Sequence, residues 1–179
     1  HTLLPAVGER LLALRTLLGS LEAAADIPQV EVSAGDDEIA LLVRHMRPLS
    51  AGDRAALADF GRTTGLRIYA QPGDLASLER LDAPDAPLHY RTDGIEIAFQ
   101  PGDFVQINAG VNAQLVPLAL ELLALAPQDV VLDLFAGLGN FTLPMANRVA
   151  AVVGVEGDAG LVARRLPRPP RRPRPGWPW

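Results

Sequence analysis

The chain contains no cysteine and no lysine among its 179 residues. Without cysteine it can form no disulfide, bind no metal or iron–sulfur cluster through thiolates, and present no thiolate nucleophile. Aromatic residues are also scarce, at 5% of the sequence, whereas hydrophobic residues make up 49% and charged residues 21%. This balance is typical of a globular domain and excludes a disordered acidic or basic chain.

Long hydrophobic runs are absent as well. No apolar stretch of the sequence approaches the roughly 18 to 20 residues that span a bilayer. The first residues show no charged segment leading into an apolar one, as a signal peptide would. We therefore expect a cytoplasmic protein without a membrane partner, with room for a small domain followed by part of another.

The first hundred residues alternate between helical and strand patterns. Leucines and alanines recur at helical spacing over residues 2–24, and Ser50 with Asp53 resembles a capping box at the start of a second helix. We predict strands at 30–32, 39–46 and 66–70, the first two as an antiparallel pair, and a hairpin at 89–99 around Thr92-Asp93-Gly94. These elements predict a small α+β unit over residues 1–102.

From residue 103 the pattern changes to that of a parallel α/β domain. The predicted elements are a helix at about 112–125, an apolar strand at 130–135, a short helix at 141–146 and a second apolar strand at 150–155. A strand, a Gly-rich turn, a helix and a strand form a βαβ unit. We end this domain at residue 163, because proline in the Pro- and Arg-rich tail 164–179 excludes helix and central strand. The tail is expected to be disordered.

The turn between the first of these strands and its helix carries the functional signal. Gly137 and Gly139 allow the backbone to turn tightly and to approach a ligand closely, and the helix start presents free N–H groups. Glu156 ends the second strand, where a doubly wound fold places an acceptor for ribose hydroxyls. A dinucleotide fingerprint would need Gly or Ala where this chain has Thr142, so adenosine without a diphosphate is favoured. S-adenosylmethionine meets these conditions.

Other interpretations of these residues stay open. The turn could be only a tight connection between strand and helix, or part of an NAD- or FAD-binding oxidoreductase. The chain could also be an RNA-binding module without catalysis, since arginines in the tail would neutralise phosphates and Trp177 and Trp179 would stack on bases. His45, Tyr90 and Arg91 could touch RNA, although packing within strands explains them better.

Three blocks of the sequence resemble those of one enzyme family. They are Asp103-Phe-Val-Gln-Ile-Asn-Ala-Gly-Val-Asn112, Leu132-Asp-Leu-Phe-Ala-Gly-Leu-Gly-Asn-Phe-Thr-Leu-Pro144 and Val153-Gly-Val-Glu-Gly157. In combination they resemble the bacterial 23S rRNA (uracil-5-)-methyltransferases, in particular the iron–sulfur-containing enzymes, over about residues 1–163. The resemblance implies an α/β fold, with a truncated Rossmann-like S-adenosylmethionine-dependent methyltransferase domain that follows the α+β unit.

The resemblance also implies a set of cofactor contacts. Gln106, Phe135, Asn140 and Glu156 would contact S-adenosylmethionine, and Gly137 and Gly139 would shape the loop around it. The pattern alone allows simpler roles: Gln106 as an ordinary loop residue, Phe135 as core and Asn140 as a helix N-cap.

The chemistry of the family needs residues that this chain lacks. A cysteine thiolate adds to C6 of uracil so that C5 can attack the methyl group, and a glutamate then removes the C5 proton. The resemblance implies a fragment, with the catalytic cysteine and glutamate after it and the cluster-binding cysteines and an RNA-binding barrel before it. We therefore expect no catalytic residue and no metal site in this chain, no methylation of RNA by it alone, and 23S rRNA as the partner of the intact enzyme.

Overall fold

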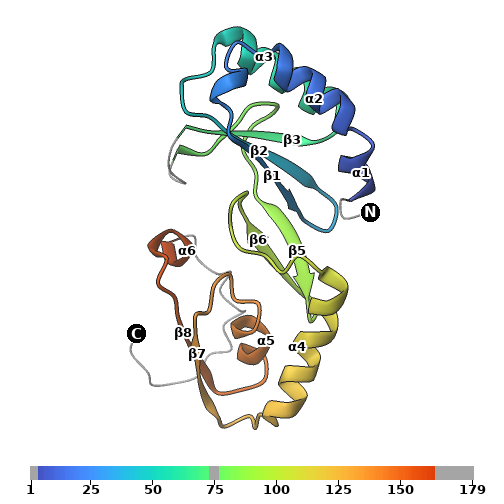
Figure 1. Ribbon diagram of the computed structural model, residues 1–179. Helices are drawn as coiled ribbons and strands as arrows, with labels where there is room; N and C mark the ends of the chain where they lie inside the picture. The colour runs from blue at the N-terminus through green and yellow to red at the C-terminus, as the bar shows by residue number, and fades with distance from the viewer. Residues whose placement is uncertain (1–3, 73–76, 164–179) are drawn as a thin grey trace. The chain divides into compact units, whose positions relative to one another are not determined.

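The computed structural model describes residues 4–72 and 77–163. The chain forms two compact units (Figure 1). The first comprises the chain up to Leu88 together with Gln100–Gly102, and the second comprises His89–Phe99 together with the chain from Asp103 onward. The predicted helix start at residue 2 and the predicted disorder of residues 164–179 lie outside the described residues.

The hairpin over residues 89–99 groups with the second unit, whereas the sequence pattern assigns it to the first. Its turn is tied to that unit by Arg148, whose guanidinium donates to both carboxylate oxygens of Asp93 at 2.6 and 3.2 Å. Tyr90 on the hairpin also reaches Asn140, with its hydroxyl 3.5 Å from the amide oxygen. Contacts between side chains, and not the order of the chain, thus decide which unit the hairpin joins.

The first unit contains a four-stranded sheet. In spatial order its strands are β1 (Gln29–Ala34), β2 (Ile39–Arg44), β3 (Arg67–Gln71) and β4 (Glu79–Arg80). The antiparallel pairing of β1 with β2 confirms the prediction, β3 runs parallel to β2, and the two-residue β4 is antiparallel to β3. Such a short strand leaves no periodic pattern in the sequence, so it was not predicted.

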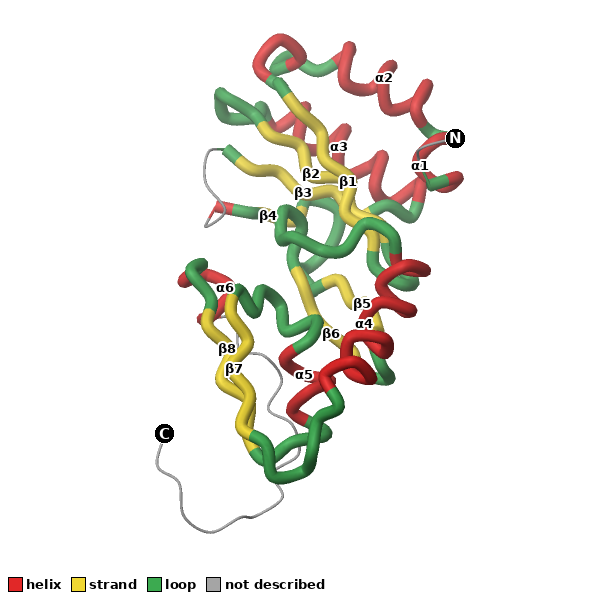
Figure 2. The backbone as a smooth tube through the Cα atoms, turned by 60° about the horizontal axis from the view of Figure 1, so that its bottom comes forward, coloured by secondary structure: helices red, strands yellow, loops and turns green. Residues whose placement is uncertain are grey.

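Helices cover one face of this sheet (Figures 1 and 2). They are α1 (Pro5–Gly8), α2 (Leu11–Ser20), the short 3₁₀ helix η1 (Ala24–Asp26) and α3 (Ala51–Thr64). Buried apolar side chains from α2, α3 and the sheet form one core, which includes Leu14, Leu57, Leu41, Val43 and Ile68. Ser50 caps α3 as predicted, because its hydroxyl accepts a hydrogen bond from Asp53 N at 3.1 Å. The reciprocal half of the predicted capping box is not formed, because the Asp53 carboxylate accepts from Glu22 N and Ala23 N instead.

The continuous helix predicted over residues 2–24 is wrong in extent, since α2 ends at Ser20. The reason is Asp53, whose buried carboxylate accepts hydrogen bonds from Glu22 N at 2.8 Å and Ala23 N at 3.1 Å. These backbone groups therefore have a partner outside the helix. A contact across 30 residues of chain ends the helix, which periodicity alone cannot indicate.

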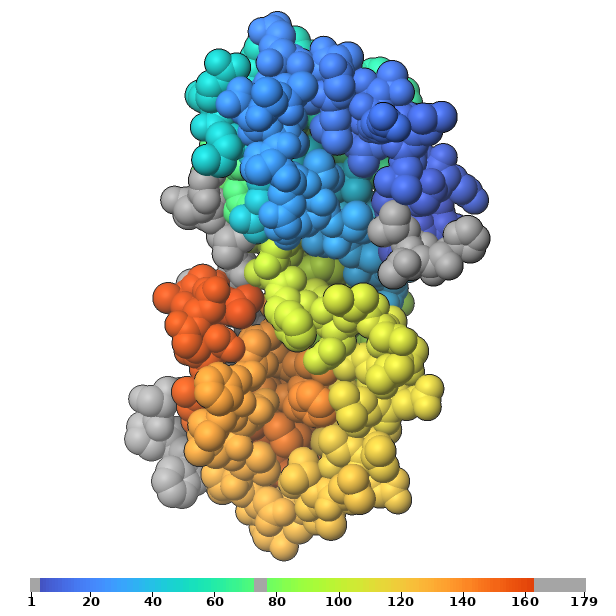
Figure 3. Space-filling view, viewed as in Figure 1, coloured from blue at the N-terminus to red at the C-terminus, as the bar shows by residue number. Residues whose placement is uncertain are grey.

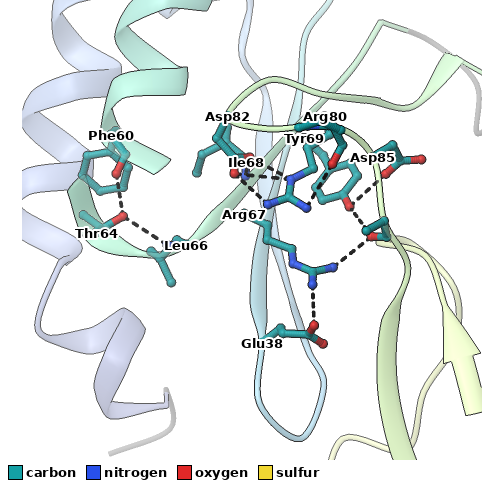
Figure 4. Close-up of polar contacts among 12 residues, drawn as sticks. Glu38, Phe60, Thr64, Leu66, Arg67, Ile68, Tyr69, Arg80, Asp82 and Asp85 are labelled. Atoms are coloured by element: carbon teal, nitrogen blue, oxygen red, sulfur yellow. Dashed lines mark hydrogen bonds and ion pairs between the residues drawn. The ribbon is translucent and has the colours of Figure 1, made fainter. Parts of the chain in front are cut away.

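Polar side chains fix the segment after β4 against β3 (Figure 4). Arg67 donates to the carbonyl oxygens of Ala86 at 2.9 Å and Pro87 at 2.8 Å, and it forms an ion pair with Glu38. The buried hydroxyl of Tyr69 lies 3.1 Å from Asp85 Oδ1 and 3.0 Å from the carbonyl oxygen of Ala86. Burial and the nearby Asp85 carboxylate raise the pKa of Tyr69.

The second unit contains the hairpin and the predicted βαβ unit. Its elements are β5 (Leu88–Thr92), which begins on the last residue of the first unit, β6 (Ile95–Phe99), α4 (Ala109–Leu123), β7 (Val130–Leu134), α5 (Thr142–Ala146), β8 (Ala151–Val155) and α6 (Ala159–Ala163). β7 and β8 pair in parallel, with Leu132 opposite Val153, which confirms the predicted βαβ unit. A small core joins α4 and α5 to one face of these strands through Val116, Leu120, Met145 and Val152.

The other face of the β7–β8 pair is apolar and open. Every second residue of β7 points there, and the exposed fractions are 73% for Val130, 59% for Leu132 and 58% for Leu134. Val153 and Val155 on β8 are 53% and 47% exposed. In the space-filling view (Figure 3), orange and red atoms from the later part of this unit lie at the surface on the drawn face.

Candidate functional site

The Gly-rich turn that follows β7 is built from residues with left-handed backbone conformations. Phe135, Gly137 and Gly139 have φ values of 63°, 55° and 91°. Such angles cost little at glycine but are uncommon for a residue with a side chain. The turn is closed by hydrogen bonds from Ala136 N to the carbonyl oxygen of Val155 at 3.0 Å and from Gly139 N to that of Ala136 at 2.8 Å.

Glu156 lies directly against this turn. One carboxylate oxygen accepts a hydrogen bond from Gly137 N at 2.7 Å, and the other accepts one from Asp158 N at 2.8 Å. The N–H groups of Asp158 and Gly137 lower the pKa of Glu156, because they stabilise its ionised form. Each carboxylate oxygen has a second lone pair, so Glu156 can still accept hydrogen bonds from a ligand.

Asn140, near the end of the turn, pairs with Asn112 on α4. Asn112 Nδ2 donates to Asn140 Oδ1 at 2.9 Å, and Asn140 Nδ2 donates to Asn112 Oδ1 at 2.9 Å. The N-cap position of α5 is occupied by Phe141, without a side-chain cap. Asn140 is therefore not a helix N-cap, and its amide joins α4 to the turn instead.

The hydroxyl of Tyr90 approaches the same amide pair. Tyr90 is buried, with its ring 5.8 Å from that of Phe99 in an edge-to-face arrangement. Burial raises the pKa of Tyr90 to about 12. This packing excludes stacking of Tyr90 on RNA in this conformation. His45 in the first unit is likewise buried, with Nδ1 2.7 Å from the carbonyl oxygen of Arg47.

The two remaining predicted contact residues are open to solvent. Phe135 is 88% exposed, so its alternative role as a core residue is wrong. Gln106 is exposed in the segment before α4, and its side chain makes no hydrogen bond to any described residue. The structure thus brings Glu156, Gly137 and Asn140 together at the turn, with Phe135 at its start, whereas the described residues show no hydrogen bond between Gln106 and the turn.

Sequence reasoning missed two features of this site. Asp133 on β7 accepts a hydrogen bond from the hydroxyl of Thr142 at the start of α5, which braces the strand against the helix across the turn. The sequence pattern also predicted no role for Asn112, which pairs with Asn140. A polar residue on the buried side of an apolar helix is a usable signal, since burying an amide costs free energy unless it is paired.

The second unit also has a surface depression away from the Gly-rich turn. A shallow depression of about 470 Å³ lies between α4 and the loop after it, and Leu120, Ala124, Leu125, Pro127 and Arg148 are among its lining residues. None of its lining residues belongs to the turn, so we do not assign it to the site.

Across residues 4–72 and 77–163, no group of three or more His, Asp or Glu side chains could hold a metal ion, and no helix is long and apolar enough to cross a bilayer.

Comparison with known proteins identifies the family. The family model for tRNA (uracil-5-)-methyltransferase matches residues 58–163, which include most of the second unit and the whole Gly-rich turn. The chain belongs to this family. The three blocks that resemble uracil-5-methyltransferases lie within the matched range, so the resemblance seen in the sequence is confirmed.

Proteins similar to this chain align with it over most of its length. It is 50% identical over 165 residues to the 23S rRNA (uracil(1939)-C(5))-methyltransferase RlmD of Stenotrophomonas maltophilia. It is 48% identical over 166 residues to the protein of the same name from Xanthomonas campestris pv. campestris. The alignments cover 91% and 92% of this chain, and the chain spans only 37% of the length of either relative.

Solved structures share the fold at low sequence identity. The tRNA (uracil-54, C5)-methyltransferase of Pyrococcus abyssi, solved in complex with S-adenosyl-L-homocysteine, aligns with a TM-score of 0.59 and 19% identity, over 79% of this chain and 36% of that one. The tRNA m1G37 methyltransferase of M. jannaschii aligns with a TM-score of 0.50 and 14% identity, over 89% of this chain and 46% of that one. This chain thus has a mixed α/β fold that is also found in RNA methyltransferases.

Proposed function

We propose that this chain is the part of a 23S rRNA uracil-C5 methyltransferase that begins the S-adenosylmethionine-binding domain. The observation that carries the proposal is the position of Glu156, whose carboxylate lies 2.7 Å from Gly137 N at the Gly-rich turn. An acidic residue at the end of the second strand, beside the turn that ends the first, is the arrangement that grips a ribose in doubly wound folds. The 50% identity to proteins named as 23S rRNA methyltransferases supports rRNA as the substrate of the whole enzyme.

The residues at the turn suit a nucleoside cofactor. An added Cβ at Gly137 would meet no atom within 4 Å, so the backbone there is open to close approach by a ligand. Phe135, 88% exposed, offers an apolar wall, and Glu156 offers ionised acceptors for ribose hydroxyls. Gln106 would add a polar contact from the segment before α4. The described residues fit S-adenosylmethionine without requiring an anion site for a diphosphate.

The chain's own residues hold and orient the cofactor in this proposal. Glu156 and Asn140 bind its polar groups, while Gly137 and Gly139 allow the backbone to approach it. When bound, S-adenosylmethionine supplies a methyl group on a positively charged sulfur. Residues 103–163 form the N-terminal part of this Rossmann-like domain, and the α+β unit precedes it.

We further propose that this chain alone does not methylate RNA. Uracil C5 is a weak nucleophile, and the enzymes that this chain resembles activate it by adding a cysteine thiolate to C6. The sequence contains no cysteine. The chain can therefore contribute cofactor binding but not this step, and it has no cysteine with which to hold the iron–sulfur cluster expected in the intact enzyme.

Calorimetric titration of the full chain tests the proposal directly. We expect binding of S-adenosylmethionine and S-adenosylhomocysteine, no binding of NAD, and a loss of about tenfold or more in affinity for Glu156→Ala, because the ribose acceptor is removed. The exposed Glu9→Ala is a matched control in the first unit and should bind like the parent. Binding of NAD in place of S-adenosylmethionine, or transfer of labelled methyl groups to uracil in rRNA by this chain, would contradict the proposal.

A further inference from the structure

Asn112 lies behind the Gly-rich turn, in the first turn of α4, with only 5% of its surface exposed. Its amide forms the reciprocal pair with Asn140, with both N···O distances at 2.9 Å. A buried amide costs free energy unless its donors and acceptors are paired, and here each amide is the partner of the other. The backbone of α4 fixes the position of Asn112, since its N–H donates to the carbonyl oxygen of the N-cap residue Asn108 at 2.9 Å.

The pair occupies one donor and one acceptor of the Asn140 amide. A primary amide has two N–H donors and an oxygen with two lone pairs. Asn112 engages one N–H and one lone pair, and the Tyr90 hydroxyl lies 3.5 Å from the same oxygen. Within residues 4–72 and 77–163, the second N–H of Asn140 is left without an acceptor.

We infer that Asn112 is a positioning residue, which holds Asn140 so that it offers a hydrogen-bond donor to the bound nucleoside. The inference rests on the proposed function, because it takes Asn140 as a contact of S-adenosylmethionine. The ligand atom that Asn140 recognises is therefore an acceptor, such as a ring nitrogen or a ribose or carboxylate oxygen of the cofactor. Without Asn112 the Asn140 amide can rotate and turn its oxygen toward the ligand. That oxygen would then face the acceptor atom of the ligand, and the two partial negative charges would repel each other.

A double-mutant cycle on the full chain tests whether Asn112 acts through Asn140. Affinity for S-adenosylhomocysteine is measured by calorimetry for Asn112→Ala, Asn140→Ala and the double variant. We expect each single change to weaken binding about tenfold, since a hydrogen bond is lost or misdirected. The double variant should bind no more than about twofold more weakly than Asn140→Ala, because Asn112 then has no amide to orient. Gln114→Ala, an exposed amide on the same helix, is the matched control and should bind like the parent.

A second variant tests the donor assignment. Asn140→Asp keeps the size of the side chain but replaces the N–H donor by a carboxylate oxygen. It should weaken binding at least as much as Asn140→Ala, because the new carboxylate oxygen would face the acceptor atom of the ligand. Asn140→Asp also keeps the inference testable if Asn112→Ala does not fold.

The outcomes separate this inference from the proposed function. A parent that binds S-adenosylhomocysteine, combined with multiplicative losses in the double variant or with parental affinity in Asn112→Ala or Asn140→Asp, overturns the inference and leaves the proposed function intact. A parent that binds neither S-adenosylhomocysteine nor S-adenosylmethionine overturns the proposed function, and the role of Asn112 fails with it.

Discussion

The parallel strand pairs of the two units differ in how well they are covered. In the first unit, four consecutive residues of β2, Ala40–Val43, are at most 1% exposed, and β2 has hydrogen-bonded neighbours on both sides. In the second unit, β7 and β8 pair only with each other among the described residues, and alternate residues such as Leu132 are more than half exposed. Both pairs are mostly apolar in sequence, as parallel strands are when both of their faces are buried.

An apolar strand sequence therefore does not by itself mean that the strand is buried on both faces. β7 and β8 have the composition of interior strands but are buried on one face only, through the core with α4 and α5. Their contribution to stability should therefore be smaller than that of β2, residue for residue. Asp133, which braces the turn, lies on the covered face of β7, whereas its neighbours Leu132 and Leu134 lie on the open face.

The largest difference between the units should appear when the central leucine of each strand is shortened. Leu41→Ala removes a side chain that is 1% exposed and should destabilise the protein by about 3 kcal/mol, since it leaves a cavity. Leu132→Ala removes one that is 59% exposed and should change the free energy of unfolding by less than about 0.5 kcal/mol. Urea denaturation followed by circular dichroism measures both values. Equal effects would show that the open face of β7 is covered in solution.

A smaller contrast is expected for two glycines. A Cβ added at Gly61 in α3 would lie 2.8 Å from Ile68 Cγ1 and 2.9 Å from the carbonyl oxygen of Leu66, so Gly61→Ala should cost about 2 kcal/mol through overpacking. Gly137→Ala meets open space and should cost about 1 kcal/mol for its left-handed backbone alone.

Thermal unfolding of these two variants gives the stability order. Titration with S-adenosylhomocysteine separates the roles of the two glycines. Gly137→Ala should weaken binding more than Gly61→Ala, although its effect on stability is smaller. A reversed order in the titration would remove Gly137 from the cofactor site.

The smallest contrast concerns two carboxylates held by backbone N–H groups. Burial opposes ionisation of Asp82, but Arg80 and the N–H of Ile68 outweigh it and lower its pKa. The pKa of Glu156 is lowered by the N–H groups of Asp158 and Gly137. A lowered pKa in the folded state means that the stabilisation is present at neutral pH and is lost as the pH falls through the folded value, below about 4.

Acid denaturation of Asp82→Asn and Glu156→Gln tests this assignment. The loss of stability between neutral pH and about pH 3 should be reduced in both variants, and more strongly in Asp82→Asn because its ion pair with Arg80 is nearly buried. A parental acid profile in Asp82→Asn would show that its carboxylate is not ionised preferentially in the folded state.

Local pattern predicted much of this fold. The antiparallel pair of β1 and β2, the capped start of α3 and the βαβ unit all follow from local patterns in the sequence. The position of Glu156 beside the turn could also be predicted from the sequence, because the parallel strands β7 and β8 end at the same edge of the sheet. The cofactor contacts of Gln106, Phe135, Asn140 and Glu156 stay predictions that the titrations above decide.

What could not be predicted depends on contacts between distant segments. The end of α2 is set by Asp53, about thirty residues further along the chain, and the hairpin joins the second unit through Arg148 and Tyr90. The pairing of Asn112 with Asn140 depends on how α4 packs against the turn, which no local spacing encodes. In each case a small set of polar contacts overrides or completes a local preference.

The strand Ala151–Val155 has a practical consequence for work with this protein. It is short, uncharged and rich in valine, within residues 4–72 and 77–163 it pairs on one edge only, and three of its side chains lie on an open apolar face. Strands of this kind lack the charged gatekeeper residues that discourage edge-to-edge association. When the protein is concentrated, aggregation should therefore begin at this strand. Val153→Lys places a charge at the centre of the strand and should raise the highest concentration at which the protein stays in solution.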